Sequence, residues 1–390
     1  MNLLFFLTNY PGHGGIERVT TIVANELVKH QVTVSILSAC NLLGKRPEDL
    51  DSRIALYHLP QPNSLLSAAN QGFLRRILAE NPFDYVIYQD SYIDTHRLLM
   101  AVGYDCEKHL VVVEHNSPLC REKLLQFTRE NLPALPLVQR VRKTLWYLSE
   151  RLREPRRFAR RHQYLLQHCR HYVLLSERFK PELEQLMGKT DFSRVSVIGN
   201  PLTLSPEINA DAVKVKDSRE MLFVGRLVRQ KGIHYLLDVW ERFTEKHPDC
   251  RLTIVGDGPL RPLIEERMAN GLKNICLAGA QDDTTAYFER ASVLLMTSVF
   301  EGFGLVLTEA MSRGCIPIAF DSYASLRDII TPDSDGFIVQ PFNIDEYVDT
   351  LSKIVAMSDT ELHALRKAAL EKAEKFRVEN ITRQWLDLLT

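Results

Sequence analysis

The feature that most constrains the fold is a regular alternation of short apolar runs with longer amphipathic segments along the chain. The apolar runs are unbroken and rich in Val, Ile and Leu, which is typical of parallel strands buried on both faces. They occupy residues 2–8, 31–39, 83–90, 109–116, 171–177 and 194–201 in the first half and 251–259, 275–279, 293–298, 316–320 and 335–339 in the second. Such alternation requires parallel sheets with helices on both faces, so the predicted class is α/β.

A chain of 390 residues is long for one hydrophobic core and comfortable for two domains. A polar run with little pattern lies near the middle and reads as a linker. We therefore predict a first domain at 1–203, a linker at 204–218, a second domain at 219–375, and a C-terminal helix at 376–390 that packs back towards the first domain.

The composition, 45% hydrophobic and 25% charged, is that of a globular protein. Residues 1–200 carry 26 Lys and Arg against 20 Asp and Glu, and the remainder carries 22 against 29. The first half is thus net basic, which indicates an anionic partner.

The seven cysteines are scattered, odd in number and without a C-x-x-C pair, so we expect reduced thiols in a cytoplasmic protein. The first apolar run is too short for a signal peptide and no basic residue precedes it. No run approaches 18 apolar residues, so we expect no membrane span.

Residues 121–170 differ in character from the rest, with thirteen Lys or Arg and four Glu interleaved with Leu, Phe, Trp and Tyr. Amphipathic helices of this composition lie on anionic membranes or bind polyphosphate head groups. Nucleic acid is the competing anion, but no recognised docking motif is present, and we do not expect it as a partner. An ordinary solvated helical surface is the alternative.

The most informative stretch is 299–317, VFEGFGLVLTEAMSRGCIP. Glu301 precedes a predicted helix and Glu309 lies inside it, and between them Gly302-Phe303-Gly304 leaves backbone N–H groups open to an anion. Two acids beside a phosphate cradle favour a ligand that also carries hydroxyls, as a nucleotide sugar does. A capped helix with surface acids is the simpler alternative.

Two cations follow the short apolar strand that begins the second domain, within residues 219–232. Arg226 and Lys231 come directly after its end, where an Arg could bind a pyrophosphate in bidentate fashion and a Lys could act as a point charge. Together with a helix N-terminus they could neutralise a leaving diphosphate, so no metal or other cofactor is required. Pairs with the spacing of metal-binding acids lie in turn-like stretches, at Asp49 and Asp51 and at Asp333 and Asp335.

The loop after the first strand only partly fits a dinucleotide-binding turn. Gly12 and Gly14 match G-x-G-x-x-G, but Glu17 stands at the third glycine position and no acid follows the second strand. A nicotinamide dehydrogenase is therefore disfavoured. Gly14 and Gly15 could still lend N–H groups to a phosphate or acceptor, and a plain tight turn is equally compatible.

Polar residues Glu114-His115-Asn116 end another apolar strand, at the edge where open α/β sheets bind ligands. His115 could hydrogen-bond a sugar hydroxyl or stabilise developing charge. A lone histidine is as often structural.

With these residues in view, the chain resembles retaining glycosyltransferases of family 4, which have the GT-B fold. The resemblance covers nearly the full length and rests on five motifs, at 14–18, 114–116, 224–232, 256–259 and the Glu-x7-Glu signature at 301–309. It implies two Rossmann-like domains whose parallel sheets face across a cleft.

The resemblance also implies roles for individual residues. Arg226 and Lys231 would bind the donor diphosphate, and Glu309 the ribose. Gly302, Phe303, Gly304 and Leu305 would supply backbone donors to the phosphates or sugar. Glu301 and His115 would hold the donor sugar as the catalytic pair, and the base would contact residues 277–280.

Similar enzymes build lipopolysaccharide, capsule or exopolysaccharide in bacteria. The resemblance therefore implies transfer of a hexose or N-acetylhexosamine, with UDP the expected nucleotide, to a hydroxyl of a lipid-linked glycan at the inner face of the plasma membrane. The absence of an obvious carboxylate nucleophile favours same-face attack. A non-transferring nucleotide-sugar epimerase and a silent sugar-nucleotide-binding subunit of an assembly complex remain the alternatives.

Overall fold

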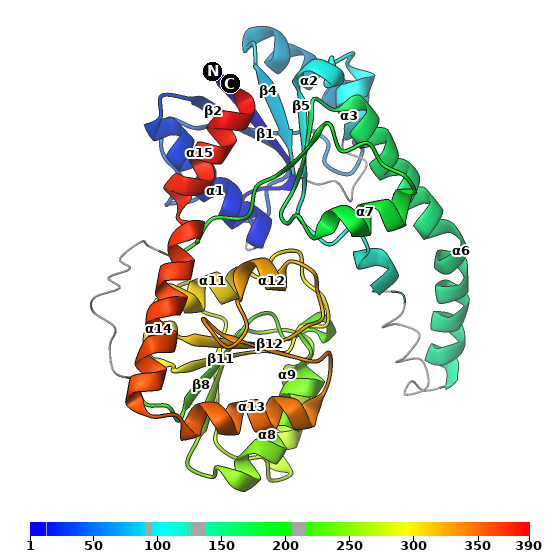
Figure 1. Ribbon diagram of the computed structural model, residues 1–390. Helices are drawn as coiled ribbons and strands as arrows, with labels where there is room; N and C mark the ends of the chain where they lie inside the picture. The colour runs from blue at the N-terminus through cyan, green and yellow to red at the C-terminus, as the bar shows by residue number, and fades with distance from the viewer. Residues whose placement is uncertain (13, 90–95, 124, 126–136, 205–215) are drawn as a thin grey trace. The chain divides into compact units, whose positions relative to one another are not determined.

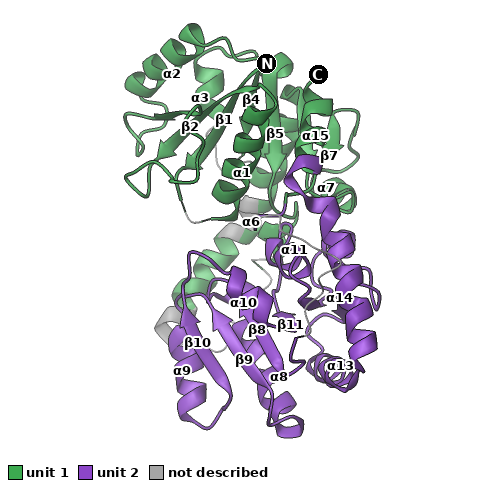
Figure 2. Cartoon of the chain, turned by 90° about the vertical axis from the view of Figure 1, so that its left-hand side faces the viewer, with its two compact units in different colours: residues 1–201, 381–390 green, residues 202–380 purple. Residues whose placement is uncertain are grey.

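The computed structural model describes residues 1–12, 14–89, 96–123, 125, 137–204 and 216–390. Contacts divide the chain into two compact units, which Figure 2 colours separately. Unit 1 comprises residues 1–201 and 381–390, and unit 2 comprises residues 202–380. The C-terminal residues 381–390 thus group with the first part of the chain. Most of the predicted linker, 204–218, lies outside the described residues.

Unit 1 is built on a parallel sheet with the strand order β3-β2-β1-β4-β5-β6-β7 among the described residues. Helices lie on both faces of this sheet (Figure 1). Its elements are β1 Asn2–Asn9, α1 Gly15–Lys29, β2 Thr33–Cys40, β3 Ala55–His58, α2 Ala68–Glu80, β4 Tyr85–Tyr88, α3 His96–Ala101, α4 Cys106–His109, β5 Leu110–Glu114, α6 Leu137–His168, β6 His171–Leu174, α7 Phe179–Met187, β7 Val195–Val197 and, at the C-terminus, α15 Val378–Leu389.

Unit 2 has a second parallel sheet with the order β10-β9-β8-β11-β12-β13. Its elements are β8 Glu220–Val224, η3 Arg229–Lys231, α8 Ile233–Lys246, β9 Arg251–Val255, α9 Arg261–Ala269, β10 Ile275–Gly279, α10 Thr285–Arg290, β11 Val293–Met296, α11 Leu305–Met311, β12 Ile316–Phe320, α12 Leu326–Ile329, β13 Phe337–Val339, α13 Ile344–Ala356, α14 Asp359–Ala373 and η4 Glu374–Phe376.

Both sheets follow the order of doubly wound nucleotide-binding folds, which confirms the prediction of two Rossmann-like α/β domains. In this order the chain winds outward from the first strand, then returns and winds the other way. The reversal leaves a crevice outside the carboxyl ends of two neighbouring strands. That switch point lies between β1 and β4 in unit 1 and between β8 and β11 in unit 2.

The strands form where the sequence is unbroken and apolar because both faces of each sheet are covered. In unit 2, α8 packs beside α13, and their buried rings, Trp240, Phe243 and Tyr347, are fully enclosed. Helix α14 begins with a capping box, since the Ser358 and Glu361 side chains each bond the other's backbone N–H. Burial of these apolar faces holds each sheet edge in place.

The basic segment contains one long helix where its residues are described. Helix α6 runs for 32 residues and continues through Pro155. Its second half packs on unit 1 through Phe158, His162 and Leu165, which are buried. The earlier residues 124 and 126–136 of the segment lie outside the described part of the chain.

Two further findings concern the whole chain. All seven cysteines are free thiols. Of the helices in the described ranges, none combines the length and the apolar character needed to cross a membrane.

Candidate active site

The loops that follow β8 and β11 meet at the switch point of unit 2. Strands β8 and β11 pair directly, so both loops leave the same sheet edge. The Val299 N–H donates to the Gln230 carbonyl at 2.8 Å, and the Thr297 hydroxyl donates to the Lys231 carbonyl at 3.0 Å. The structure thus brings together the two segments that the sequence assigned to donor binding.

Glycine is required at two points of these loops. Gly232 has a φ of 65°, and an added Cβ would lie 1.9 Å from the Thr297 carbonyl oxygen. Gly304 has a φ of 96° and precedes α11 as its N-cap. Both positions favour glycine because a side chain would be strained there. The Ser325 hydroxyl fixes the loop further by donating to the Gly302 carbonyl at 3.0 Å.

The side chains within this loop differ in what they can offer a ligand. Phe303 is buried and its ring contacts Phe376 edge to face, so only its backbone can serve a ligand. Leu305 is the first residue of α11, which has only seven residues and therefore a weak dipole. Backbone N–H groups are what this loop provides.

Lys231 and Glu301 form an ion pair at this edge. The Lys231 Nζ lies 2.6 Å from Glu301 Oε1, and the two side chains are only 18% and 10% exposed. The sequence assigned Lys231 to the diphosphate and Glu301 to the sugar, and the structure shows them as direct partners. Because the pair is largely shielded from water, removing either charge would leave the other uncompensated.

Arg226 lies two residues beyond the end of β8 and is exposed. Among the described residues, its guanidinium makes no hydrogen bond that would have to break before it met an anion. It is therefore available to a ligand at the same edge as Lys231.

Glu309 is buried in α11, and its carboxylate accepts a hydrogen bond from the Thr203 hydroxyl. Thr203 is buried as well and was not singled out from the sequence. In the sequence, Thr203 stands out only as a polar residue shortly after Asn200-Pro201. That pattern is too common to predict a contact with a residue more than a hundred positions away. The contact fixes the orientation of a carboxylate expected to bind ribose.

The residues expected to contact the base lie at the end of β10. This strand is at one edge of the sheet, and Gly279 accepts from the Gly256 N–H at 2.8 Å. Leu277, Ala278 and Gly279 are half-buried and Ala280 is exposed. Beyond this edge position, the structure assigns them no function.

In unit 1, the glycine loop leads into α1, with Gly14 as its N-cap and Gly15 as its first residue. Both are exposed. A Cβ on Gly14 would lie 2.2 Å from Glu17 Oε2, because that side chain folds back over the loop. The atom met is the end of a flexible side chain and Gly14 has a φ of −84°, so the structure does not require glycine at position 14.

His115 follows β5 and is buried. Its Nε2 contacts Oε1 of Gln89, the residue that follows β4. Burial lowers the pKa of His115 to about 4, so the ring is neutral at pH 7. A neutral ring offers no positive charge, so of the two roles considered, hydrogen bonding to a hydroxyl fits the structure better. Gln89 was missed, although its place at a strand end was a usable signal.

Glu114 does not face a ligand at the sheet edge. It is fully buried, and its carboxylate contacts the Tyr172 hydroxyl and the His162 ring. We expected all three residues of Glu114-His115-Asn116 to present polar groups at this edge. That expectation is wrong for Glu114, whose carboxylate instead contacts neighbours inside unit 1.

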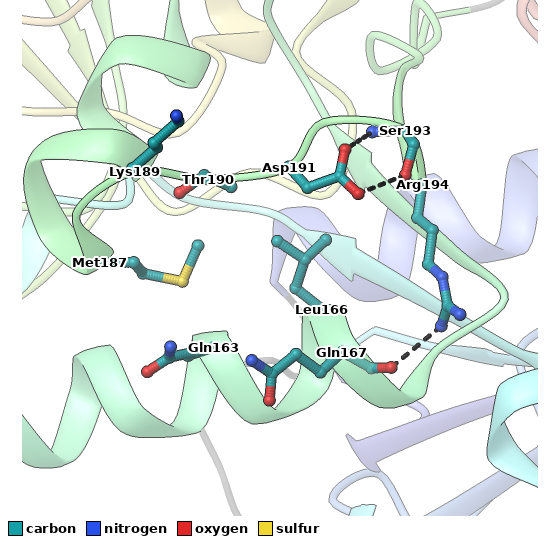
Figure 3. A pocket seen from close by; sticks show the side chains of 9 residues that line it. All are labelled: Gln163, Leu166, Gln167, Met187, Lys189, Thr190, Asp191, Ser193 and Arg194. Carbon is teal, nitrogen blue, oxygen red and sulfur yellow. Dashed lines mark hydrogen bonds between the residues drawn. The ribbon is translucent and has the colours of Figure 1, made fainter.

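A separate pocket of about 380 Å³ lies between the end of α6 and the loop that leads into β7 (Figure 3). Much of its polar lining is already bonded, since Asp191 accepts from Ser193 and Arg194 donates to the Gln167 carbonyl. No residue predicted for the active site lines it. It adjoins the amino ends of β6 and β7, at the edge opposite His115, and we do not assign the reaction to it.

Within the described residues, no group of three or more His, Cys, Asp or Glu side chains is arranged to hold a metal ion.

Comparison with known proteins places these features in a family. Residues 13–205 match the profile described as "Glycosyltransferase Family 4", and residues 205–375 match "Glycosyl transferases group 1". The two matches together span nearly the whole chain.

Three relatives align over almost their full length. An uncharacterized glycosyltransferase of Haemophilus influenzae is 28% identical over 99% of each chain. The amylovoran biosynthesis glycosyltransferase AmsD of Erwinia amylovora is 23% identical over 99% of each chain. An α-1,4-N-acetyl-D-galactosaminyltransferase of Campylobacter jejuni, named for an acceptor ending in PP-undecaprenol, is 24% identical over 96% of this chain and 95% of its own.

Solved structures share the fold. TarM superposes with a TM-score of 0.73 at 12% identity, covering 100% of this chain and 98% of its own. HepE of Anabaena, solved with UDP and glucose, superposes at 0.72 and 15% identity, and WaaG, a glycosyltransferase involved in lipopolysaccharide biosynthesis, at 0.69 and 17%. Both matches cover 100% of this chain and 99% of the other.

Proposed function

The chain belongs to the GT4-type glycosyltransferases with the GT-B fold, and on that premise we propose that it moves a hexose or N-acetylhexosamine from a UDP-linked sugar to a lipid-linked glycan. Its full-length relatives include glycosyltransferases named for bacterial polysaccharide synthesis and for an undecaprenol-linked acceptor. A neighbour of the same fold was solved with UDP-glucose, which supports the choice of nucleotide.

The observation that carries the proposal is the Lys231–Glu301 pair, set in two glycine-bearing loops at the switch point of unit 2. An incoming diphosphate offers Lys231 a partner of higher charge than Glu301. The carboxylate would then be free to accept hydrogen bonds from the hydroxyls of the sugar. One exchange of partners thus serves both ends of the donor.

The remaining donor contacts follow the same edge. Arg226 would bind the diphosphate, and backbone N–H groups of Gly302, Phe303, Gly304 and Leu305 would bind the phosphates or sugar. Glu309, oriented by Thr203, would bind the ribose. These groups supply enough positive charge for a leaving diphosphate, so the proposed reaction uses no metal.

We propose that the reaction retains the anomeric configuration. The bond between the anomeric carbon and the diphosphate oxygen breaks, and the acceptor oxygen bonds to the same face of that carbon. The acceptor hydroxyl gives its proton to the departing phosphate oxygen. His115, neutral at pH 7, would hold a sugar hydroxyl in place.

Helix α6 supports a peripheral association with the inner face of the plasma membrane. Val141, Leu145 and Leu148 share one helix face and are 53%, 64% and 48% exposed. Exposed cations accompany this apolar stripe, among them Arg142 and Lys143. Apolar insertion combined with cationic contact to head groups is how amphipathic helices bind anionic membranes.

The test is a donor and acceptor screen with purified protein. We expect UDP release that depends on a lipid-linked acceptor and survives a chelator, and a product whose anomeric proton shows retention. UDP release or sugar isomerisation without acceptor would favour an epimerase, and binding without turnover would favour a silent subunit. An inverted product would refute the proposed step.

A further inference from the structure

The carboxylate of Glu114 closes the turn that carries His115. Its Oε1 accepts a hydrogen bond from the Asn116 N–H at 3.2 Å, so the side chain of the residue before His115 is bonded to the backbone of the residue after it. A turn held by its own first side chain has few ways to move. The position of the His115 backbone is therefore set by whatever holds Glu114.

Tyr172 and His162, which belong to other elements, are among the residues that hold that carboxylate. The Tyr172 hydroxyl, from β6, donates to Glu114 Oε2 at 3.3 Å. The His162 Nδ1, from α6, lies 3.3 Å from the same oxygen and 2.8 Å from the Tyr172 hydroxyl. All three side chains are fully buried. Buried polar groups of this kind are held in one geometry, because loss of any member leaves a polar atom unsatisfied.

The hydrogen positions in this group follow from its burial. Burial lowers the pKa of His162 to about 3, so its ring is neutral at pH 7, and the contact with Glu114 is a hydrogen bond and not an ion pair. Burial also keeps the Tyr172 hydroxyl protonated by raising its pKa well above the usual value. Tyr172 therefore donates to Glu114, and the one hydrogen of His162 lies on Nδ1, facing both partners.

We infer that Glu114, Tyr172 and His162 act together as a clamp that positions His115, and that α6 thereby holds one part of the active-site geometry. The inference rests on the proposed function, since His115 is assigned to the reaction only there. All three are positioning residues, because none is placed against the substrate. The same helix carries the surface proposed to meet the membrane, so the clamp joins that helix to the reacting edge of unit 1.

The experiment removes the α6 contact and asks whether the effect passes through His115. His162→Leu abolishes the hydrogen bonds, and His162→Asn keeps a donor near the position of Nδ1. We expect His162→Leu to lower kcat about tenfold or more with the donor KM within about twofold, and His162→Asn to recover most of the loss. Leu165→Ala is the matched control, because it removes packing from the same buried helix face without touching the clamp. It should lower the Tm while kcat per folded molecule stays unchanged.

A double-mutant cycle supplies the decisive readout. In a His115→Ala background, His162→Leu should have no further effect on kcat, because the residue it positions is gone. An equal fold loss in both backgrounds would overturn the inference, as would a loss reproduced by Leu165→Ala. An inactive His115→Ala beside a fully active His162→Leu would overturn it too.

A measurement without catalysis separates this inference from the proposed function. Amide hydrogen exchange of a peptide that contains Asn116 should speed up in Tyr172→Phe and His162→Leu but not in Leu165→Ala. If no UDP-sugar is turned over by the wild type, the proposed function fails while faster exchange still supports the clamp. Unchanged exchange in both clamp variants would refute the clamp whatever the activity.

Discussion

Replacing Lys231 by alanine should have two effects. It should lower the free energy of unfolding, because Glu301 loses its partner, and it should weaken UDP binding, because the diphosphate loses a cation. Removal of one member of a fully buried pair costs about 3–5 kcal/mol. The Lys231 and Glu301 side chains retain 18% and 10% exposure, so we expect the lower part of that range or slightly less, about 2–3 kcal/mol. For a unit of this size that corresponds to a Tm lower by about 4–12 °C.

The binding effect follows from the loss of a charged hydrogen bond to the diphosphate, worth about 1.5–3 kcal/mol. UDP affinity should therefore fall by about 10–150-fold. Titration calorimetry with UDP and with UMP measures it, and the loss should be much smaller for UMP, which lacks the second phosphate. Lys189→Ala removes an exposed lysine in unit 1 and should change neither Tm nor affinity.

The double variant Lys231→Met, Glu301→Gln separates the two effects. It removes both charges at similar volume, so it should regain most of the lost stability but none of the lost UDP affinity. If Lys231→Ala lowered the Tm while its UDP affinity stayed at the wild-type value, the lysine would be purely structural and the assignment of the donor diphosphate to this edge would be wrong.

Four other changes test separate parts of the molecule. Thr203→Val removes the hydroxyl that Glu309 accepts from, so UDP affinity measured by calorimetry should fall about 2–12-fold, and Thr203→Ser should restore it. Gly14→Ala should change the free energy of thermal unfolding by less than about 1 kcal/mol, because Gly14 has a φ of −84° and the added Cβ would meet only the end of the flexible Glu17 side chain. Leu145→Glu should weaken cosedimentation with anionic vesicles about 10-fold or more without changing UDP affinity, because the side chain is 64% exposed. As pH falls from 7 to 5, the unfolded state protonates His115 before the folded state, whose pKa is about 4, so stability should drop by about 2 kcal/mol from this residue alone, and His115→Gln should lose that part of the pH dependence.

The features that could be predicted from the sequence are those that local residue patterns determine. Unbroken apolar runs marked the central strands, and cations or glycines directly after them marked the sheet edge, so the position of Arg226, Lys231 and Gly304 at that edge was predicted before the fold was known. Strand β3 was missed because it has only four residues, all half-buried at the sheet edge, and therefore lacks an apolar run.

Pairings between distant residues were not predictable in the same way. The bond from Thr203 to Glu309 and the bond from Tyr172 to Glu114 join residues 106 and 58 positions apart. Whether a carboxylate at a strand end faces a ligand or the core depends on which partners the fold places beside it. Glu114 and His115 are adjacent in sequence, yet the Glu114 carboxylate contacts Tyr172 and His162 whereas the His115 ring contacts Gln89.

The charge of the first half of the chain now has a location that bears on mechanism. Thirteen of its 26 Lys and Arg lie in residues 121–170, and most of those whose burial is described on α6, such as Arg142, Arg156 and Arg160, are exposed, whereas Arg161 is half-buried. The sheet edge of the same unit instead presents a neutral histidine. Positive charge is therefore concentrated on a helix surface in unit 1, whereas in unit 2 Lys231 and Arg226 stand at the sheet edge itself. A departing diphosphate needs cations next to it, and an acceptor hydroxyl does not, so this distribution favours diphosphate binding at the edge of unit 2 and leaves the charge of α6 for an anionic surface.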